Sequence, residues 1–202
     1  MKPLRDIPFN IVIKSISGKD VIRFDENNEK HKKVLEILIE VARLTSKYIN
    51  SKGISSKRPN EVGNKVEKVV KEVFKEKGII AKTPQTTTSK TKSSGYPDII
   101  FWYNEEPYYL ECKTFNKSNL QSTQRTFYFS PSENFKVAYD TIHFMLAFEI
   151  YYERDKNKYK CKSFKIISIE SLSVDLKYEF NSDNKRMYSN IDGAKILHQE
   201  EF

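Results

Sequence analysis

Cysteine is nearly absent from this sequence: only Cys112 and Cys161 occur among its 202 residues. Two cysteines in a chain of this length do not build a disulfide framework, and neither stands in the Cys-x-x-Cys pair that is typical of zinc sites. We therefore expect two reduced thiols and a fold that depends on neither a disulfide nor zinc.

Long hydrophobic runs are also missing. The longest candidate covers residues 144–150, and Glu149 interrupts it, whereas a membrane helix needs about 20 apolar residues. Residues 1–13 contain Asp6 and Asn10 and lack the apolar stretch and the small-residue cleavage site of a signal peptide. We therefore expect a cytoplasmic protein with no membrane partner.

Positive charge is the most unusual property that the sequence does have. Its 35 Lys and Arg residues exceed its 27 Asp and Glu residues and give a net charge of +8. Such a charge favours a polyanionic partner, with nucleic acid ahead of a membrane surface. The length and the 38% hydrophobic content suit one packed interior, so we expect residues 1–202 to form a single domain.

Apolar residues at helical spacing predict two main helices. The first covers about residues 28–50, with Gly53 ending the pattern, and the second covers about residues 60–77, where a stripe of valines precedes Gly78. A third, shorter helix is expected at residues 135–141.

Runs rich in β-branched and aromatic residues predict strands between and after these helices. They cover residues 78–82, 96–103, 107–115, 143–152 and 159–169. Alternation over residues 9–24 predicts a short hairpin or an extended segment, residues 83–95 read as a polar loop, and residues 171–202 are ambiguous. Strands interleaved with helices imply a mixed α/β or α+β layer architecture.

A cluster of charged residues lies on the expected hairpin of residues 96–115. Asp98, after Pro97, opens one strand, and Glu111-Cys112-Lys113 closes the next. Because side chains alternate along a strand, Glu111 and Lys113 share one face while Cys112 points into the core. Symmetric pairing about the turn would bring Asp98 opposite this segment. Two close carboxylates repel, and a divalent cation with hard oxygen ligands relieves the repulsion, which predicts magnesium.

These residues resemble the signature of the PD-(D/E)XK nuclease superfamily, and of its type II restriction-endonuclease-like enzymes, over about residues 60–152. The resemblance implies a restriction-endonuclease-like α/β (α+β) fold with a central mixed β-sheet flanked by helices. It also implies that Asp98 and Glu111 bind one or two Mg²⁺ ions and that the Cys112 backbone carbonyl adds an oxygen. Lys113 would orient or deprotonate the attacking water.

A helix motif extends the resemblance. Gly63 and Glu67 fit the Gly-x-x-x-Glu helix of the superfamily, whose glutamate reaches the metal site, and Glu61 is the alternative accessory carboxylate. The order of the expected elements, from this helix through the Gly78 turn to the two strands of the motif, also matches the superfamily.

Each of these residues also has an ordinary structural interpretation. Asp98 can belong to a turn that enters a strand, and Glu111 with Lys113 can be a solvated pair of little energetic value. Glu67 stands four residues before Lys71 and can form a surface ion pair with it. The hydrophobic strands around the first three residues favour the catalytic interpretation, whereas for Glu67 both interpretations stay open.

Polar and basic residues flank the motif on both sides and could contact DNA. Upstream, small hydroxyl residues surround Lys90 and Lys92, a composition that suits either phosphate contact or a solvated loop. Downstream, side chains able to hydrogen-bond base edges or phosphates are those of Asn116, Lys117, Ser118, Gln121, Gln124 and Arg125.

The sequence therefore predicts a type II restriction endonuclease-like enzyme that hydrolyses phosphodiester bonds of double-stranded DNA with magnesium at a specific sequence. We expect a homodimer, because cutting both strands needs two active centres, and a cognate DNA methyltransferase in the same system. The alternatives are a Holliday junction resolvase or DNA repair nuclease of the same fold, a subunit that cuts one strand beside a larger partner, and a non-catalytic DNA-binding module. Clustered carboxylates repel phosphate and so argue against the last.

Overall fold

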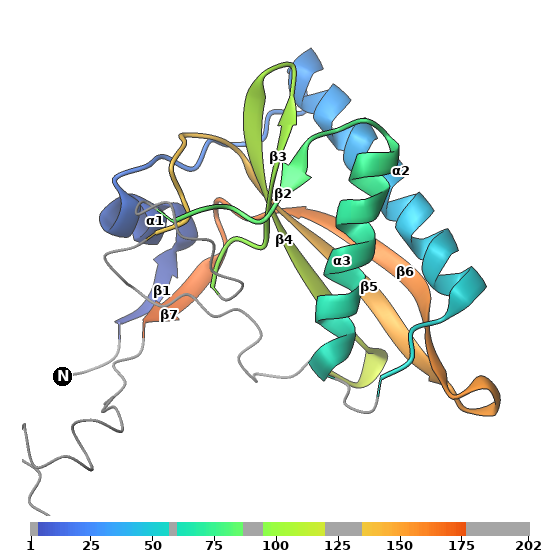
Figure 1. Ribbon diagram of the computed structural model, residues 1–202. Coiled ribbons are helices and arrows are strands. Elements are labelled where there is room, and N and C mark those ends of the chain that lie inside the picture. The colour runs from blue at the N-terminus through green and yellow to red at the C-terminus, as the bar shows by residue number, and fades with distance from the viewer. Residues whose placement is uncertain (1–3, 57–59, 87–94, 120–134, 177–202) are drawn as a thin grey trace, which may run out of the picture. The chain divides into compact units, whose positions relative to one another are not determined.

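The structure is a computed structural model that describes residues 4–56, 60–86, 95–119 and 135–176. The chain divides into two compact units, one of residues 8–173 and one of residues 1–7 with residues 174–202. Strands β1 (Leu4–Pro8) and β7 (Ser173–Leu176) pair in a two-stranded sheet, most of which belongs to the smaller unit (Figure 1). That residues 1–202 form a single domain stays a prediction.

A five-stranded mixed sheet forms the centre of the larger unit (Figure 1). Its strands, in spatial order, are β2 (Ala81–Lys82), β3 (Ile99–Tyr103), β4 (Glu106–Phe115), β5 (His143–Glu153) and β6 (Lys158–Ser168). β4 and β5 run parallel, and the other neighbours are antiparallel. This mixed sheet flanked by helices confirms the predicted restriction-endonuclease-like fold class.

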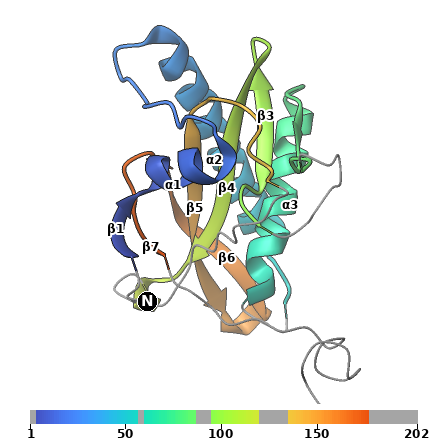
Figure 2. The same cartoon turned by 90° about the vertical axis from the view of Figure 1, so that its left-hand side faces the viewer.

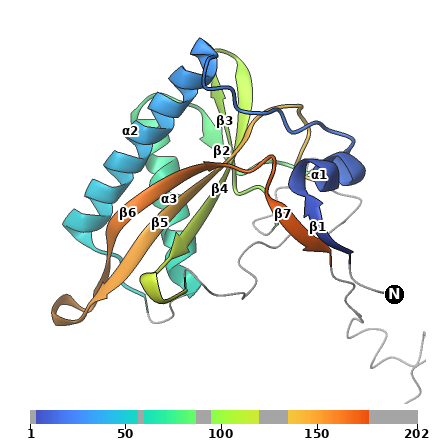
Figure 3. The same ribbon diagram turned by 180° about the vertical axis from the view of Figure 1, so that it is seen from behind.

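Within the described residues, three helices flank this sheet. α2 (Glu29–Lys52) and α3 (Asn60–Glu76) lie together on one side of it, and α1 (Phe9–Ser17) lies on the other side (Figures 2 and 3). Two short 3₁₀ turns, η1 (Lys117–Asn119) and η2 (Arg154–Lys156), follow β4 and β5. The strand order β2-β3-β4-β5-β6 makes β2 and β6 the two edge strands of the sheet.

The hydrophobic core lies between the sheet and the pair α2 and α3. Val66 and Val70 of α3 and Leu110 of β4 are fully buried in it, and burial of each such side chain stabilises the fold by about 1.5–3 kcal/mol. Because side chains alternate along β4, the opposite face of the strand carries Glu111 and Lys113. Helices α2 and α3 therefore pack on the face of β4 that is opposite to Glu111 and Lys113.

Most of the predicted elements are confirmed. The helices expected at about residues 28–50 and 60–77 are α2 and α3, and the side chain of Asn28 caps α2 by accepting hydrogen bonds from two backbone N–H groups. The predicted hairpin is β3 with β4, and the two later strands are β5 and β6. Of the strand predicted at residues 78–82, the structure has the two-residue strand Ala81–Lys82, and the carbonyl of Ile80 also accepts from the N–H of Trp102.

The hairpin or extended segment predicted at residues 9–24 is wrong, since residues Phe9–Ser17 form helix α1. Phe9, Val12 and Ile13 are the buried residues of this helix, and their spacing of three and four is helical rather than alternating. Gly18 then adopts a left-handed backbone conformation with φ 70° and ends the helix.

The helix predicted at residues 135–141 is also wrong, because the described chain is irregular there. Its backbone groups bond to distant residues instead of to one another. The Tyr109 hydroxyl donates to the carbonyl of Lys136 at 3.3 Å and accepts from the N–H of Ala138 at 2.7 Å. Thr141 forms a parallel bridge with Val21. These long-range bonds compete successfully with a helix of only two turns.

Two predicted regions lie partly outside the described residues. Residues 87–94 of the predicted polar loop belong to that part of the chain, as do residues 177–202 of the ambiguous end, where the described portion contains β7. In the part of the chain that the structure describes, no helix is both long and apolar enough to cross a membrane.

Gly53 offers a test of the packing between α2 and β6. Its φ of 69° and ψ of 156° belong to a region open essentially to glycine, and an added Cβ would lie 2.9 Å from Lys158 Cβ. We expect Gly53→Ala to lower the free energy of unfolding by about 3 kcal/mol. Urea denaturation followed by circular dichroism measures the change.

Gly18→Ala is the matched control, because Gly18 has a similar φ of 70° and an added Cβ there would meet nothing within 4 Å. It should cost only about 1 kcal/mol for the left-handed backbone. Equal losses in the two variants would contradict the close approach of Lys158 to Gly53.

Candidate active site

The register of the β3–β4 hairpin brings Asp98 and Glu111 together. Ile99 pairs with Leu110, so Asp98, one residue before β3, lies beside Glu111, one residue further along β4. Alternation along β4 places Cys112 in the core on the helix side, where 8% of it is exposed. The predicted meeting of two acidic side chains from neighbouring strands therefore occurs.

Each of the two carboxylates accepts a hydrogen bond from a backbone N–H of the segment that carries the other. The N–H of Asp98 donates to Glu111 Oε2 at 3.2 Å, and the N–H of Cys112 donates to Asp98 Oδ2 at 2.9 Å. Lys113 Nζ lies 2.6 Å from Glu111 Oε1. Each carboxylate is thus oriented by a backbone donor of the opposite strand, and Glu111 is oriented by an ammonium as well.

Burial and mutual repulsion shape the electrostatics of this cluster. Glu111 is only 4% exposed, whereas Asp98 is half-buried. Burial raises the pKa of Glu111 to about 7, and repulsion from Asp98 contributes to the rise, while Lys113 opposes it. Burial alone would lower the pKa of Lys113, but Glu111 and Asp98 bring it above its ordinary value. The charged form of Glu111 is therefore disfavoured in the absence of a further cation.

The carboxylate pair fits a divalent cation. A hard cation accepts carboxylate and carbonyl oxygens and would offset the repulsion that raises the pKa of Glu111. Burial raises the pKa of the Cys112 thiol well above its ordinary value, so only the carbonyl of this residue suits such a site. Among the described residues, no three or more His, Cys, Asp or Glu side chains gather around one point. The fit therefore depends on Asp98 and Glu111.

Glu67 and Glu61, the two candidates for an accessory carboxylate, lie on α3 and have different partners. Glu67 Oε1 is 2.5 Å from Lys71 Nζ, and Lys71 also donates to Thr83 Oγ1 at 2.7 Å. The exposed Glu61 accepts a hydrogen bond of 3.0 Å from the Ser56 hydroxyl. Glu67 acts electrostatically on the buried Cys112 beside Asp98, so it is the candidate whose charge reaches the site.

The residues predicted to contact DNA divide into two groups. Asn116, Lys117 and Ser118 follow β4 directly and are exposed, and the Ser118 hydroxyl donates to Asn116 Oδ1 at 2.6 Å. The remaining predicted contacts lie outside the described residues: Lys90, Lys92, Gln121, Gln124 and Arg125.

Two further lysines that the sequence did not single out lie near the site. Lys165 of β6 is aligned with Lys113 through Ala147 of β5, so the three share one face of the sheet, and Lys165 is exposed. Lys136 is only 5% exposed, and Asp98, Glu111 and Glu67 act on its charge. Its neighbours Phe135 and Val137 do not by themselves indicate this burial, because a lysine beside apolar residues usually extends its ammonium to water.

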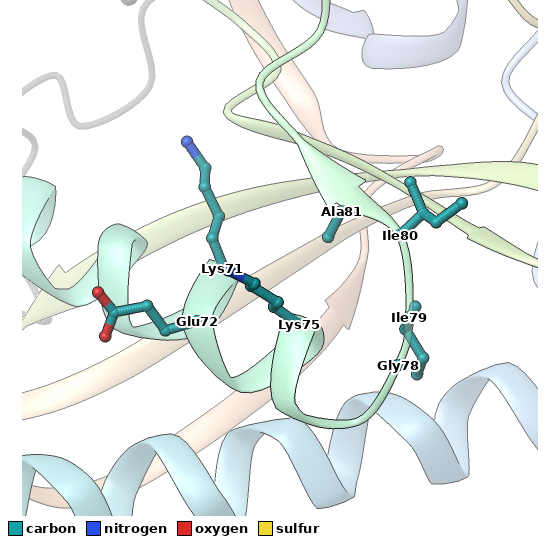
Figure 4. Close-up of a pocket in the computed structure, with 7 residues that line it drawn as sticks. All are labelled: Lys71, Glu72, Lys75, Gly78, Ile79, Ile80 and Ala81. Carbon is teal, nitrogen blue, oxygen red and sulfur yellow. The ribbon is translucent and has the colours of Figure 1, made fainter.

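A surface depression of about 490 Å³ lies apart from these carboxylates, between the end of α3 and the start of β2 (Figure 4). Its lining is formed by Lys71, Glu72, Lys75 and residues 78–81. Asp98, Glu111 and Lys113 do not line it, so the candidate site is defined by the charged cluster on the hairpin.

Comparisons with known proteins identify the family of this chain. Residues 4–191 match the model of the type II restriction enzyme MjaV family. The type II restriction enzyme MjaV of Methanocaldococcus jannaschii is 38% identical over 204 aligned positions, which cover 93% of this chain and 87% of that protein. No solved structure matches the chain significantly. The chain belongs to the type II restriction enzyme MjaV family.

Proposed function

We propose that this chain is a magnesium-dependent type II restriction endonuclease that hydrolyses phosphodiester bonds of double-stranded DNA at a specific sequence. One observation carries the proposal: Asp98 and Glu111 accept hydrogen bonds from each other's segments, and Lys113 forms an ion pair with Glu111. The chain that carries this cluster belongs to a family of type II restriction enzymes.

Asp98 and Glu111 would hold one or two Mg²⁺ ions, and the backbone carbonyl of Cys112 would add an oxygen. Bound magnesium supplies positive charge that polarises the scissile phosphate and lowers the pKa of a coordinated water. Glu67, paired with Lys71 on α3, would assist as the accessory carboxylate.

Lys113 is proposed to act as an ammonium. Its pKa lies above its ordinary value because of Glu111 and Asp98, so it keeps its proton at neutral pH. A protonated lysine donates hydrogen bonds but accepts no proton. Lys113 therefore suits orientation of the attacking water and stabilisation of the negative charge that develops on the phosphate.

The face of the sheet that carries Glu111 is the proposed DNA-binding side. Lys165 lies on this face in line with Lys113, and Lys117 follows the end of β4. Both side chains are exposed, and lysine ammonium groups bind backbone phosphates. The predicted contacts of Asn116 and Ser118, and of the residues outside the described chain, belong to the same proposal.

The proposed reaction implies an assembly and a setting. Cutting both strands requires two active centres, so we propose a homodimer with one centre in each subunit. A cognate DNA methyltransferase in the same system would protect host DNA without being bound to this chain. The enzyme would act in the cytoplasm, where it meets DNA.

Replacing one proposed metal ligand should abolish cleavage without unfolding the site. In Asp98→Asn the amide oxygen can still accept from the Cys112 N–H, but the charge is lost, so plasmid cleavage in Mg²⁺ should fall about 10³-fold. Binding of DNA in Ca²⁺ should be retained. Asp155→Asn, at an exposed position of η2, is the matched control and should cleave normally.

A plasmid assay followed by sequencing of the cut ends measures both rate and specificity. Wild-type rates in Asp98→Asn would rule out the proposed centre. Preference for a four-way junction over linear duplex would replace the restriction activity by that of a resolvase.

The ionisation of Glu111 should appear in the pH dependence of stability. Without metal, its folded-state pKa of about 7 lies above the ordinary glutamate pKa of 4.5. This contribution to stability is complete below about pH 4.5 and is lost as the pH rises through about 7. Glu111→Gln cannot ionise, so in EDTA its stability relative to wild type should increase between about pH 5 and pH 8, by on the order of 3 kcal/mol.

Thermal denaturation in EDTA and in Mg²⁺ measures this effect. Magnesium should raise the Tm of wild type at about pH 8 and leave that of Glu111→Gln unchanged. Parallel pH profiles of the two proteins in EDTA would disprove the assigned ionisation of Glu111.

Loss of a phosphate contact should change the salt dependence of DNA binding. Lys117→Ala and Lys165→Ala should each weaken binding in Ca²⁺ and reduce the slope of log K against log salt concentration by about 1. Fluorescence anisotropy at several KCl concentrations measures the slope. Lys47→Ala, at an exposed position of α2 on the other side of the sheet, should leave it unchanged. Wild-type slopes in both test variants would place DNA elsewhere.

A further inference from the structure

Lys136 has an unusual environment for a lysine. Only 5% of it is exposed, and its ammonium donates to the carbonyl of Gly95 at 2.7 Å and to that of Pro97 at 3.3 Å. Burying an ammonium is costly unless hydrogen bonds and negative charge compensate for the lost water. Both acceptors belong to the three residues that precede Asp98.

The backbone around Lys136 is fixed independently of its side chain. The hydroxyl of Tyr109, a fully buried residue of β4, donates to the Lys136 carbonyl and accepts from the Ala138 N–H. Val137, between them, is 2% exposed. The lysine thus extends from a segment anchored on β4 toward the segment that leads into β3, and its ammonium ties the two together.

The charge of Lys136 also lies within the field of the site. Burial lowers the pKa of Lys136, and the carboxylates of Asp98, Glu111 and Glu67 oppose the lowering, in that order of strength. Lys113 contacts Glu111 directly. Asp98 has no comparable ammonium contact among the described ion pairs, and Lys136 is the cation that binds the backbone leading to it.

We propose that Lys136 is a positioning residue of the candidate active site, whose ammonium binds the carbonyls of Gly95 and Pro97 and thereby fixes the carboxylate of Asp98. This role deepens the proposed nuclease function, on which its catalytic consequence rests. The position of Asp98 can be read without catalysis, because Asp98 Oδ2 is the acceptor of the Cys112 N–H at 2.9 Å. If Asp98 moves, that N–H loses its partner.

The test compares Lys136→Met with Lys160→Met. Methionine keeps the length and apolar stem of lysine but removes its charge and donors. Lys160 is a matched control, because it is 7% exposed and its ammonium donates to the carbonyl of Asn50 at 2.6 Å. Lys160 is therefore also a buried lysine on a backbone carbonyl, but that carbonyl belongs to α2.

Hydrogen exchange measured by NMR on the metal-free full chain provides the first readout. In Lys136→Met the Cys112 amide should exchange at least about 10-fold faster than in wild type, approaching its rate in Asp98→Ala, while the amide of Leu110 keeps its protection. In Lys160→Met the Cys112 amide should exchange as in wild type. Unchanged exchange at Cys112 in Lys136→Met overturns the proposal.

Cleavage kinetics provide the second readout. Lys136→Met should lower kcat by about 10- to 100-fold with KM for DNA unchanged within about twofold, because a misplaced ligand impairs the chemical step more than binding. Lys160→Met should retain the wild-type kcat at a temperature where both variants are folded. Equal losses of kcat in the two variants would reduce Lys136 to a structural lysine and overturn the proposal.

Two further comparisons keep the test decisive. If Lys136→Met does not fold, Lys136→Arg and Lys136→Gln replace it: the arginine keeps the charge and should protect the Cys112 amide better, and equal exchange in both overturns the proposal. If wild type itself leaves DNA intact in Mg²⁺, the proposed nuclease activity fails, whereas the exchange of the Cys112 amide still decides the role of Lys136.

Discussion

Repulsion between two carboxylates on neighbouring strands is the constraint around which this site is built. The register of β3 and β4 places Asp98 beside Glu111, and burial of Glu111 weakens the screening of their charges by water. Backbone N–H donors from the opposite strands and the ammonium of Lys113 offset part of the repulsion. The remainder favours either a proton or a cation between the carboxylates, and this choice would link ionisation of the site to the proposed metal binding.

The opposite face of the sheet keeps the two carboxylates close together, because its buried side chains fix the register of β4. Val66 and Val70 of α3 pack against the face of Leu110, so a slip of β4 by one residue would expose the core face and bury Lys113 against the helices. The free energy of the core therefore fixes the register, and the register fixes the carboxylates. Core residues on the opposite face of the sheet, such as Val66 and Val70, thus help to determine where the charged cluster forms.

Local pairing explains why the motif could be predicted from the sequence and Lys136 could not. Asp98 and Glu111 flank one hairpin, so the turn at residues 104–105 determines their meeting. Lys136 reaches the site through a segment that Tyr109 anchors by long-range hydrogen bonds, which no local periodicity records. Helix α1 was missed for a related reason, since few apolar residues in a short window fit both a helical and an alternating period.

The two lysines near the carboxylates, Lys113 and Lys136, differ in burial and in the direction of their pKa shifts. Lys113 contacts Glu111 and its side chain is 27% exposed, so carboxylate attraction outweighs burial and its pKa rises. Lys136 is more deeply buried and contacts only carbonyl groups among its described hydrogen bonds, so burial outweighs attraction and its pKa falls. The partly exposed ammonium of Lys113 can meet water and phosphate, whereas the buried ammonium of Lys136 is held by the carbonyls of Gly95 and Pro97. This difference supports the two proposed roles, Lys113 as the lysine that meets substrate and Lys136 as the lysine that positions Asp98.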